Sequence, residues 1–161
     1  ADVRVARIFN TYGPRMRPDD GRIVSNLVNQ AIKGAPLTVY GTGEQTRSFC
    51  YVTDMVKGLM ALMALAPNPK VPVNLGNPGE FTVGELAAMV RRLVPSAGRI
   101  VYQPLPQDDP QRRRPDIARA QALLGWQPRV ALAQGLEETI AWFRDAGARQ
   151  ERRSRKRRET V

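Results

Sequence analysis

Short apolar runs alternate along the chain with segments in which apolar residues recur every three or four positions. The short runs are typical of strands and cover residues 3–9, 37–40, 48–51, 71–75 and 100–102. The segments with helical spacing cover residues 24–31, 56–63, 86–93 and 136–143. Residues 3–9, which are rich in valine and isoleucine, predict a buried strand. Alternating strands and helices predict an α/β fold.

Local signals place several of these elements more closely. Thr82 and Glu85 have the spacing of a capping box, and Gly34 and Gly125 stand where helices are expected to end. The glycine-containing segment after residue 40 predicts either a hairpin or a broad loop. We expect the first two helices to bury these side chains: Val24, Leu27, Val28 and Ala31, and then Val56, Leu59, Met60 and Met63.

Composition limits the chemistry that the chain can perform. Its 161 residues are 42% hydrophobic and 25% charged, which predicts one globular domain. Histidine is absent and Cys50 is the single cysteine, which excludes histidine catalysis, a cysteine zinc site and an internal disulfide. We therefore expect no catalytic residue and no metal site. No apolar run reaches the length of a membrane span. The first residues do not resemble a signal peptide and do not include an initiator methionine, so we expect the chain to begin inside a longer protein.

The net charge of +10 is concentrated at the C-terminus. Residues 149–161 contain seven basic and two acidic residues. The sequence predicts a domain over residues 1–148 and a basic, disordered tail over residues 149–161. Such a tail can bind nucleic acid nonspecifically, but it has no aromatic residues on which bases could stack, so this alternative is disfavoured.

Several polar and aromatic residues stand where a ligand could bind. Asn10 and Thr11 follow the first predicted strand, at the end where open α/β sheets bind ligands, although a turn alone also explains Asn10. Arg47 can hold a diphosphate by bidentate bonds, or can be an ordinary surface arginine. Tyr40 can stack on a base or can be a strand aromatic. The spacing does not tell which side chain of the arginine run 112–114 points into a site.

Four sequence blocks in order resemble the extended short-chain dehydrogenases/reductases that act on nucleotide sugars, the NAD-dependent epimerases/dehydratases. They are residues 7–16 (RIFNTYGPRM), 37–47 followed by 51–54, 74–77 (NLGN), and 113–116 with 124–128. Residues 20–26 and 108–117 are most similar to the UDP-glucuronate decarboxylases. The dTDP-glucose 4,6-dehydratases and the epimerases share the other blocks and stay open as alternatives. The resemblance implies the C-terminal part of an extended Rossmann fold plus a small substrate-binding α/β subdomain.

The resemblance also implies roles for particular residues. Thr11 and Arg22 would contact NAD. A UDP-sugar such as UDP-glucuronate would be bound by Asn10, Tyr40, Gln45, Arg47 and Arg113. The reaction implied is oxidation at C4, loss of CO2 and reduction to UDP-xylose by the same cofactor.

The chain lacks the family's glycine-rich cofactor turn and its catalytic Tyr-x-x-x-Lys. We therefore expect no decarboxylase activity from it alone. By the same resemblance we expect a homodimer at full length. Because no targeting signal is visible in the sequence, we expect a cytoplasmic location. A non-catalytic partner subunit is a further alternative.

Overall fold

The structure is a computed structural model, and it describes the backbone of residues 1–105 and 112–159. Within these ranges, the side chains of residues 112–113 and 149–159 are not described. The helices are α1 (Ile23–Ile32), α2 (Val52–Ala64), α3 (Val83–Leu93), α4 (Ala118–Leu124) and α5 (Leu132–Glu159). The strands are β1 (Ala6–Ile8), β2 (Thr11–Tyr12), β3 (Leu37–Tyr40), β4 (Thr46–Ser48), β5 (Cys50–Tyr51), β6 (Val73–Leu75), β7 (Glu80–Thr82), β8 (Ile100–Gln103) and β9 (Arg112–Arg113).

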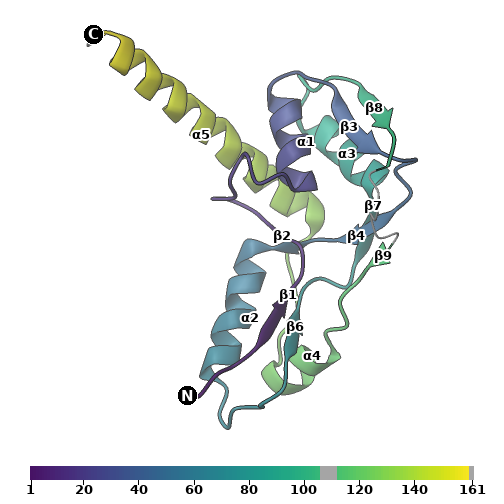
Figure 1. Cartoon of the computed structure of the whole chain (residues 1–161), viewed down its shortest axis with the longest axis vertical. Coiled ribbons are helices and arrows are strands. Elements are labelled where there is room, and N and C mark those ends of the chain that lie inside the picture. Colours follow the sequence, from purple (N-terminus) through teal and green to yellow (C-terminus); the bar gives the residue numbers. More distant parts are fainter. Residues whose placement is uncertain (106–111, 160–161) are drawn as a thin grey trace.

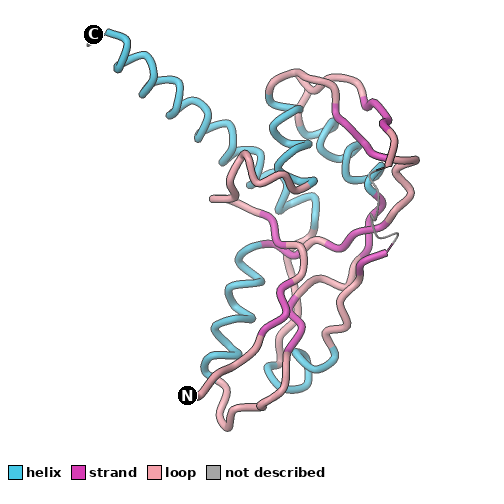
Figure 2. Tube along the Cα trace, viewed as in Figure 1, coloured by secondary structure: helices cyan, strands magenta, loops and turns pink. Residues whose placement is uncertain are grey.

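Parallel pairing dominates the described strands, and this confirms the α/β class. The parallel pairs are β1 with β6, β2 with β5, β3 with β8, and β4 with β9, while β7 runs antiparallel to β4. Figure 2 shows the strands as short segments between the helices. Since β3 and β4 pair with other strands and not with each other, the segment between them is a broad loop and not a hairpin.

The elements form two lobes that follow one another along the long axis of the molecule (Figure 1). We call the first the pocket lobe; it contains α1, β3, α3, β8 and the first turns of α5. We call the second the β1 lobe; it contains β1, α2, β6 and α4. The short strands β2, β4, β5, β7 and β9 lie between them (Figure 1).

The pocket lobe has the larger apolar core. Its helix α1 buries the predicted face, with Val24, Leu27, Val28 and Ala31 all nearly inaccessible. Thr82 and Glu85 form the predicted capping box at the start of α3. Helix α5 adds Leu136, Ile140 and Phe143 to the same core.

The β1 lobe differs from the expectation in two places. In α2 the buried face is Asp54, Met55, Gly58 and Leu62, whereas Val56, Met60 and Met63 are exposed, so the predicted apolar face was wrong. Gly58 explains the difference: a Cβ there would lie 2.9 Å from Trp126, and this close contact turns the Gly58 side of α2 inward. Residues 3–9 form only the three-residue β1, which has one neighbouring strand and is largely exposed.

Helix α5 extends beyond the predicted domain boundary at residue 148 and leads away from both lobes (Figure 1). We expected residues 149–161 to be disordered, whereas the structure assigns residues 149–159 to this helix. The side chains of this segment are outside the described residues. The division of the chain at residue 148 stays a prediction.

Candidate functional site

A pocket with a volume of about 300 Å³ lies between α1, β3 and β4, and β2 contributes to its base. Six of the seven predicted site residues line this pocket, although they come from four different parts of the chain. They are Asn10, Thr11, Arg22, Tyr40, Gln45 and Arg47. The structure therefore brings together the residues that the sequence analysis singled out.

Arg47 provides a buried positive charge in the pocket wall. It is 9% exposed, and its Nη1 donates a hydrogen bond of 2.8 Å to the Thr46 carbonyl. Strand β9 runs parallel to β4 and pairs Arg113 with Arg47 in register. The backbone of the seventh predicted residue is thus adjacent to Arg47, while the Arg113 side chain lies outside the described residues.

The broad loop between β3 and β4 is closed at its base by a predicted site residue. Gln45 Nε2 donates a 2.7 Å hydrogen bond to the Tyr40 carbonyl, and the Gln45 carbonyl accepts one of 3.1 Å from the Val83 amide. These contacts hold the loop against the start of α3. Tyr40 itself remains 43% exposed, so its ring is available to a ligand.

Two buried aromatic residues that the sequence analysis did not select form the floor of the pocket. The rings of Tyr12 and Phe49 meet edge to face with centroids 6.4 Å apart. The Tyr12 hydroxyl donates a 3.3 Å hydrogen bond to the Leu132 carbonyl at the start of α5. Burial raises the pKa of Tyr12 far above its ordinary value, so the phenol stays protonated. This floor therefore offers apolar contact rather than acid–base chemistry.

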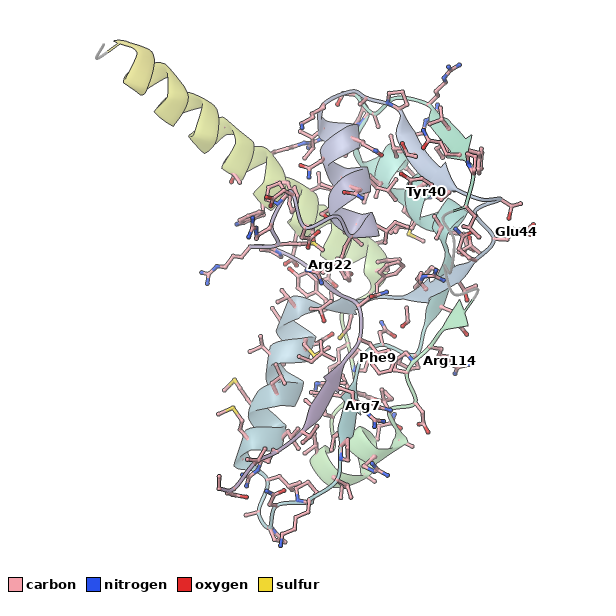
Figure 3. The ribbon with its side chains drawn as sticks, viewed as in Figure 1. Arg7, Phe9, Arg22, Tyr40, Glu44 and Arg114 are labelled. Atoms are coloured by element: carbon pink, nitrogen blue, oxygen red, sulfur yellow. The ribbon has the colours of Figure 1, made fainter. Side chains whose placement is uncertain are left out.

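Arg22 stands at the boundary of two cavities. It lines the pocket described above and also a second, more open cavity of about 450 Å³ formed with Arg7, Ile8, Phe9 and Asn10. Figure 3 shows Arg22 beside the start of α1, and Arg7 and Phe9 along β1 and its end. The Arg22 guanidinium donates to the Thr11 carbonyl at 3.1 Å, and the Thr11 hydroxyl donates to the Phe9 carbonyl at 2.9 Å.

Asp20, which lies in the stretch 20–26 but was not predicted as a site residue, holds Arg22 in this position. Its carboxylate lies 2.7 Å from Arg22 Nη2. Partial burial raises the pKa of Asp20, but hydrogen bonds from Ser25 and Arg22 outweigh that effect, and the pKa is lower than usual. Asp20 is therefore ionised at neutral pH.

Arg7, Phe9 and Arg22 line the second cavity at the carboxyl end of β1, which is the end of a strand where α/β folds bind ligands. Among the side chains that the structure describes, no group of three histidine, cysteine or carboxylate side chains could hold a metal ion. The described residues also contain no helix that is long and apolar enough to cross a membrane.

Comparison with known proteins agrees with this architecture. Residues 1–76 match the NAD dependent epimerase/dehydratase family model. An epimerase from Methanothermobacter thermautotrophicus superposes with a TM-score of 0.82 at 34% identity, over 87% of this chain and 42% of that one. The UDP-glucuronic acid 4-epimerase of Bacillus cereus, solved with UDP-glucuronic acid and NAD, gives a TM-score of 0.82 at 28% identity, over 89% of this chain and 45% of that one.

The chain is thus similar to the NAD-dependent epimerases/dehydratases, by the family model over residues 1–76 and by curated relatives over 89% of its length. Among curated relatives it is 57% identical over 143 residues to UDP-glucuronic acid decarboxylase 1 of Xenopus tropicalis, over 89% of this chain and 34% of that protein. It is 56% identical to UDP-glucuronic acid decarboxylase 4 of Arabidopsis thaliana, over 89% of this chain and 32% of that protein. The chain thus spans about a third of the length of these relatives. The resemblance stated from the sequence is confirmed, and the likeness to decarboxylases is stronger than that to epimerases.

Proposed function

We propose that this chain is the UDP-sugar-binding part of an NAD-dependent UDP-glucuronate decarboxylase. The observation that carries the proposal is the convergence of six predicted residues on one pocket, in a chain more than half identical to named decarboxylases. The pocket combines a buried cation, amide groups and aromatic rings. A nucleoside diphosphate needs the same combination, because it presents two phosphates beside a flat base.

In this proposal each side chain binds one part of the ligand. Arg47, with Arg113 from the neighbouring strand, faces the diphosphate, since arginine matches phosphate oxygens in bidentate geometry. Tyr40 and Gln45 contact the nucleoside, and Asn10 lies toward the sugar. The buried rings of Tyr12 and Phe49 exclude water from the inner side of the pocket.

NAD is the proposed cofactor, and Thr11, which lines the first pocket, would lie near it. Arg22 lines both cavities and would contact NAD and the diphosphate of the UDP-sugar at their junction. Bound NAD supplies the hydride acceptor, while the protein supplies position and electrostatics. The chain contains no Tyr-x-x-x-Lys pair, and no lysine, cysteine or carboxylate is among the described residues that line the pocket. We therefore propose that the chain binds and orients the nucleotide sugar but does not turn it over alone.

The exposed apolar residues of the β1 lobe support the proposal that more of the fold covers this side. Val5 and Ile8 near β1 are 50% and 58% exposed, and Met60 and Met63 of α2 are 63% and 74% exposed. Exposed apolar surface of this kind favours association with another protein surface. Homodimerisation of the full-length enzyme and a cytoplasmic location stay predictions.

The experiment measures binding and turnover separately. Calorimetric titration with UDP-glucuronate, UDP-glucose and dTDP-glucose should show saturable binding, tightest for UDP-glucuronate. Incubation with UDP-glucuronate and NAD, followed by chromatography, should yield no UDP-xylose. Tighter binding of dTDP-glucose would favour a 4,6-dehydratase, and turnover by the chain alone would contradict the division of roles proposed here.

A further inference from the structure

A small cluster of polar side chains stands where the two cavities meet. The Asp20 carboxylate accepts hydrogen bonds from the Arg22 amide at 3.0 Å and from Arg22 Nε at 2.8 Å, and Nη2 lies 2.7 Å away. Ser25, a fully buried residue of α1, has its hydroxyl within hydrogen-bond distance of both the Asp20 carboxylate and the Arg22 carbonyl, and its single proton serves one acceptor at a time. The Asp20 side chain is only 15% exposed, whereas that of Arg22 is 52% exposed. The carboxylate is therefore the fixed member of the pair.

The other end of the Arg22 guanidinium is also held. Its Nη1 donates to the Thr11 carbonyl on β2 at 3.1 Å. A guanidinium has five N–H groups, and the contacts among the described residues engage one each on Nε, Nη1 and Nη2. One N–H on each terminal nitrogen thus remains for a ligand at the boundary of the two cavities.

We propose that Asp20 is a positioning residue that holds the Arg22 guanidinium in its ligand-binding orientation. This inference rests on the proposed function, because the ligand is taken to be an anionic nucleoside diphosphate. A free arginine side chain has many rotamers and loses that freedom on binding. Asp20 removes most of this freedom before the ligand arrives, so that less affinity is lost on association.

The carboxylate also repels an anionic ligand, and this effect opposes the first. The repulsion acts through solvent at a half-exposed site, so salt screens it. The hydrogen bonds that fix Arg22 are direct contacts at 2.7–3.1 Å and are much less sensitive to salt. Binding measured in about 0.5 M salt, where the Debye length is roughly 4 Å, therefore reports mainly on positioning.

Asp19 provides a matched control one residue away. It forms the same kind of ion pair with Arg17 at 2.9 Å, but both side chains are exposed, and neither residue lines a cavity described here. Asp19→Asn and Asp20→Asn therefore change the net charge equally in the same loop. Only the second removes a contact to the pocket.

The test is calorimetric titration of the chain with UDP in 0.5 M salt. We expect Asp20→Asn to weaken UDP binding about tenfold, Arg22→Met to weaken it by a similar factor, and Asp19→Asn to change it less than twofold. In the Arg22→Met background, Asp20→Asn should have almost no further effect. A purely structural role would instead reduce binding equally in both backgrounds.

Ser25→Ala keeps the test decisive if Asp20→Asn does not fold. It removes the hydroxyl shared by Asp20 and the Arg22 carbonyl without changing any charge, and we expect UDP binding to weaken about threefold, with a loss of stability of about 1 kcal/mol that leaves the chain folded. Unchanged or tighter UDP binding by the variants of Asp20 and Ser25 would overturn the inference. If the unmodified chain binds no UDP, the proposed function itself fails, which is a different result.

Discussion

The two lobes of this molecule differ in how completely they bury their apolar residues. In the pocket lobe, α1, α3 and α5 surround the core with side chains such as Leu27, Leu86 and Leu136, which are 0–1% exposed. In the β1 lobe, β1 pairs with β6 and packs against α2 within the described part of the chain. Val5, Ile8, Met60 and Met63 remain at least half exposed there.

From this contrast we infer that the two lobes differ in how far they depend on contact with another protein surface. The pocket lobe, which contributes α1 and β3 to the pocket, is packed on its own, while β2 and β4 complete the pocket between the lobes. The β1 lobe presents apolar residues on β1 and α2 that would be stabilised by contact with another surface. The chain should therefore bind a ligand in the pocket lobe while its β1 lobe stays prone to association.

The largest effect should come from creating a cavity in the pocket lobe. Leu37 on β3 is completely buried, and Leu37→Ala should lower the free energy of unfolding by about 4 kcal/mol through lost burial and the cavity left behind. Met60→Ala in the β1 lobe is the counterpart, and because Met60 is 63% exposed it should cost less than about 0.5 kcal/mol. Urea unfolding measures both, and equal losses would refute the contrast.

The next effect concerns the contact that joins α2 to the segment before α5. The buried Asp54 carboxylate accepts hydrogen bonds from the amides of Arg129 at 2.7 Å and Val130 at 2.8 Å. Asp54→Ala leaves these amides without their acceptor and should cost about 2–3 kcal/mol in urea unfolding. The exposed Asp145→Ala is the control and should cost less than about 0.5 kcal/mol. A loss for Asp54→Ala no larger than that of the control would show that the two lobes are not coupled through this carboxylate.

High pH should destabilise the chain moderately. Burial raises the pKa of Cys50 to about 12 from an ordinary value of 9.0, so the unfolded state releases this proton first. The contribution of Cys50 is fully present below pH 9 and is lost as pH rises toward 12, by up to about 1.4 kcal/mol per pH unit. Burial also raises the pKa of Tyr12, which adds to the loss above pH 10.

Urea unfolding at pH 8 and pH 10 measures this dependence. Cys50→Ala should remove the part of the slope that belongs to the thiol, even though it lowers stability at every pH. A slope that is identical in the variant would contradict the assignment to Cys50.

The smallest effect on stability should come from the exposed face of α2. Replacing Val56, Met60 and Met63 with Thr, Gln and Gln should change the free energy of unfolding by less than about 1 kcal/mol. The same variant should bind less of a hydrophobic dye and associate less in sedimentation experiments. Unchanged dye binding would show that this face is not the apolar surface that distinguishes the β1 lobe.

The sequence predicts the pocket lobe better than the β1 lobe, for a physical reason. In α1 the apolar residues lie on one face only, and that face is buried. In α2 there are apolar residues on two faces, and periodicity cannot tell which face packs inward. The inward face is set by Gly58, because the absence of a side chain there lets Trp126 approach α2 closely. A glycine adds nothing to an apolar pattern, so the sequence does not reveal this contact.

The site was predictable mainly through the resemblance to a family. Spacing alone left Asn10, Tyr40 and Arg47 with ordinary structural explanations, because their convergence depends on contacts between distant segments. Asp20 was missed because aspartate before glycine is typical of a turn. Tyr12 and Phe49 were missed because pocket floors and core positions carry the same apolar signal in a sequence.

The central claim is that the pocket binds the diphosphate of a UDP-sugar through Arg47, and calorimetric titration of UDP into the chain and its Arg47→Met variant tests it most directly. Lys33→Met, at the exposed end of α1, is the control because it changes the charge by the same amount. Arg47 is buried in the pocket wall, and we predict that its loss weakens UDP binding by about 10- to 100-fold, the equivalent of roughly 1.5–3 kcal/mol for hydrogen bonds to a charged group. Lys33→Met should bind UDP as the unmodified chain does. Equal UDP affinity for the Arg47 and Lys33 variants would contradict the account.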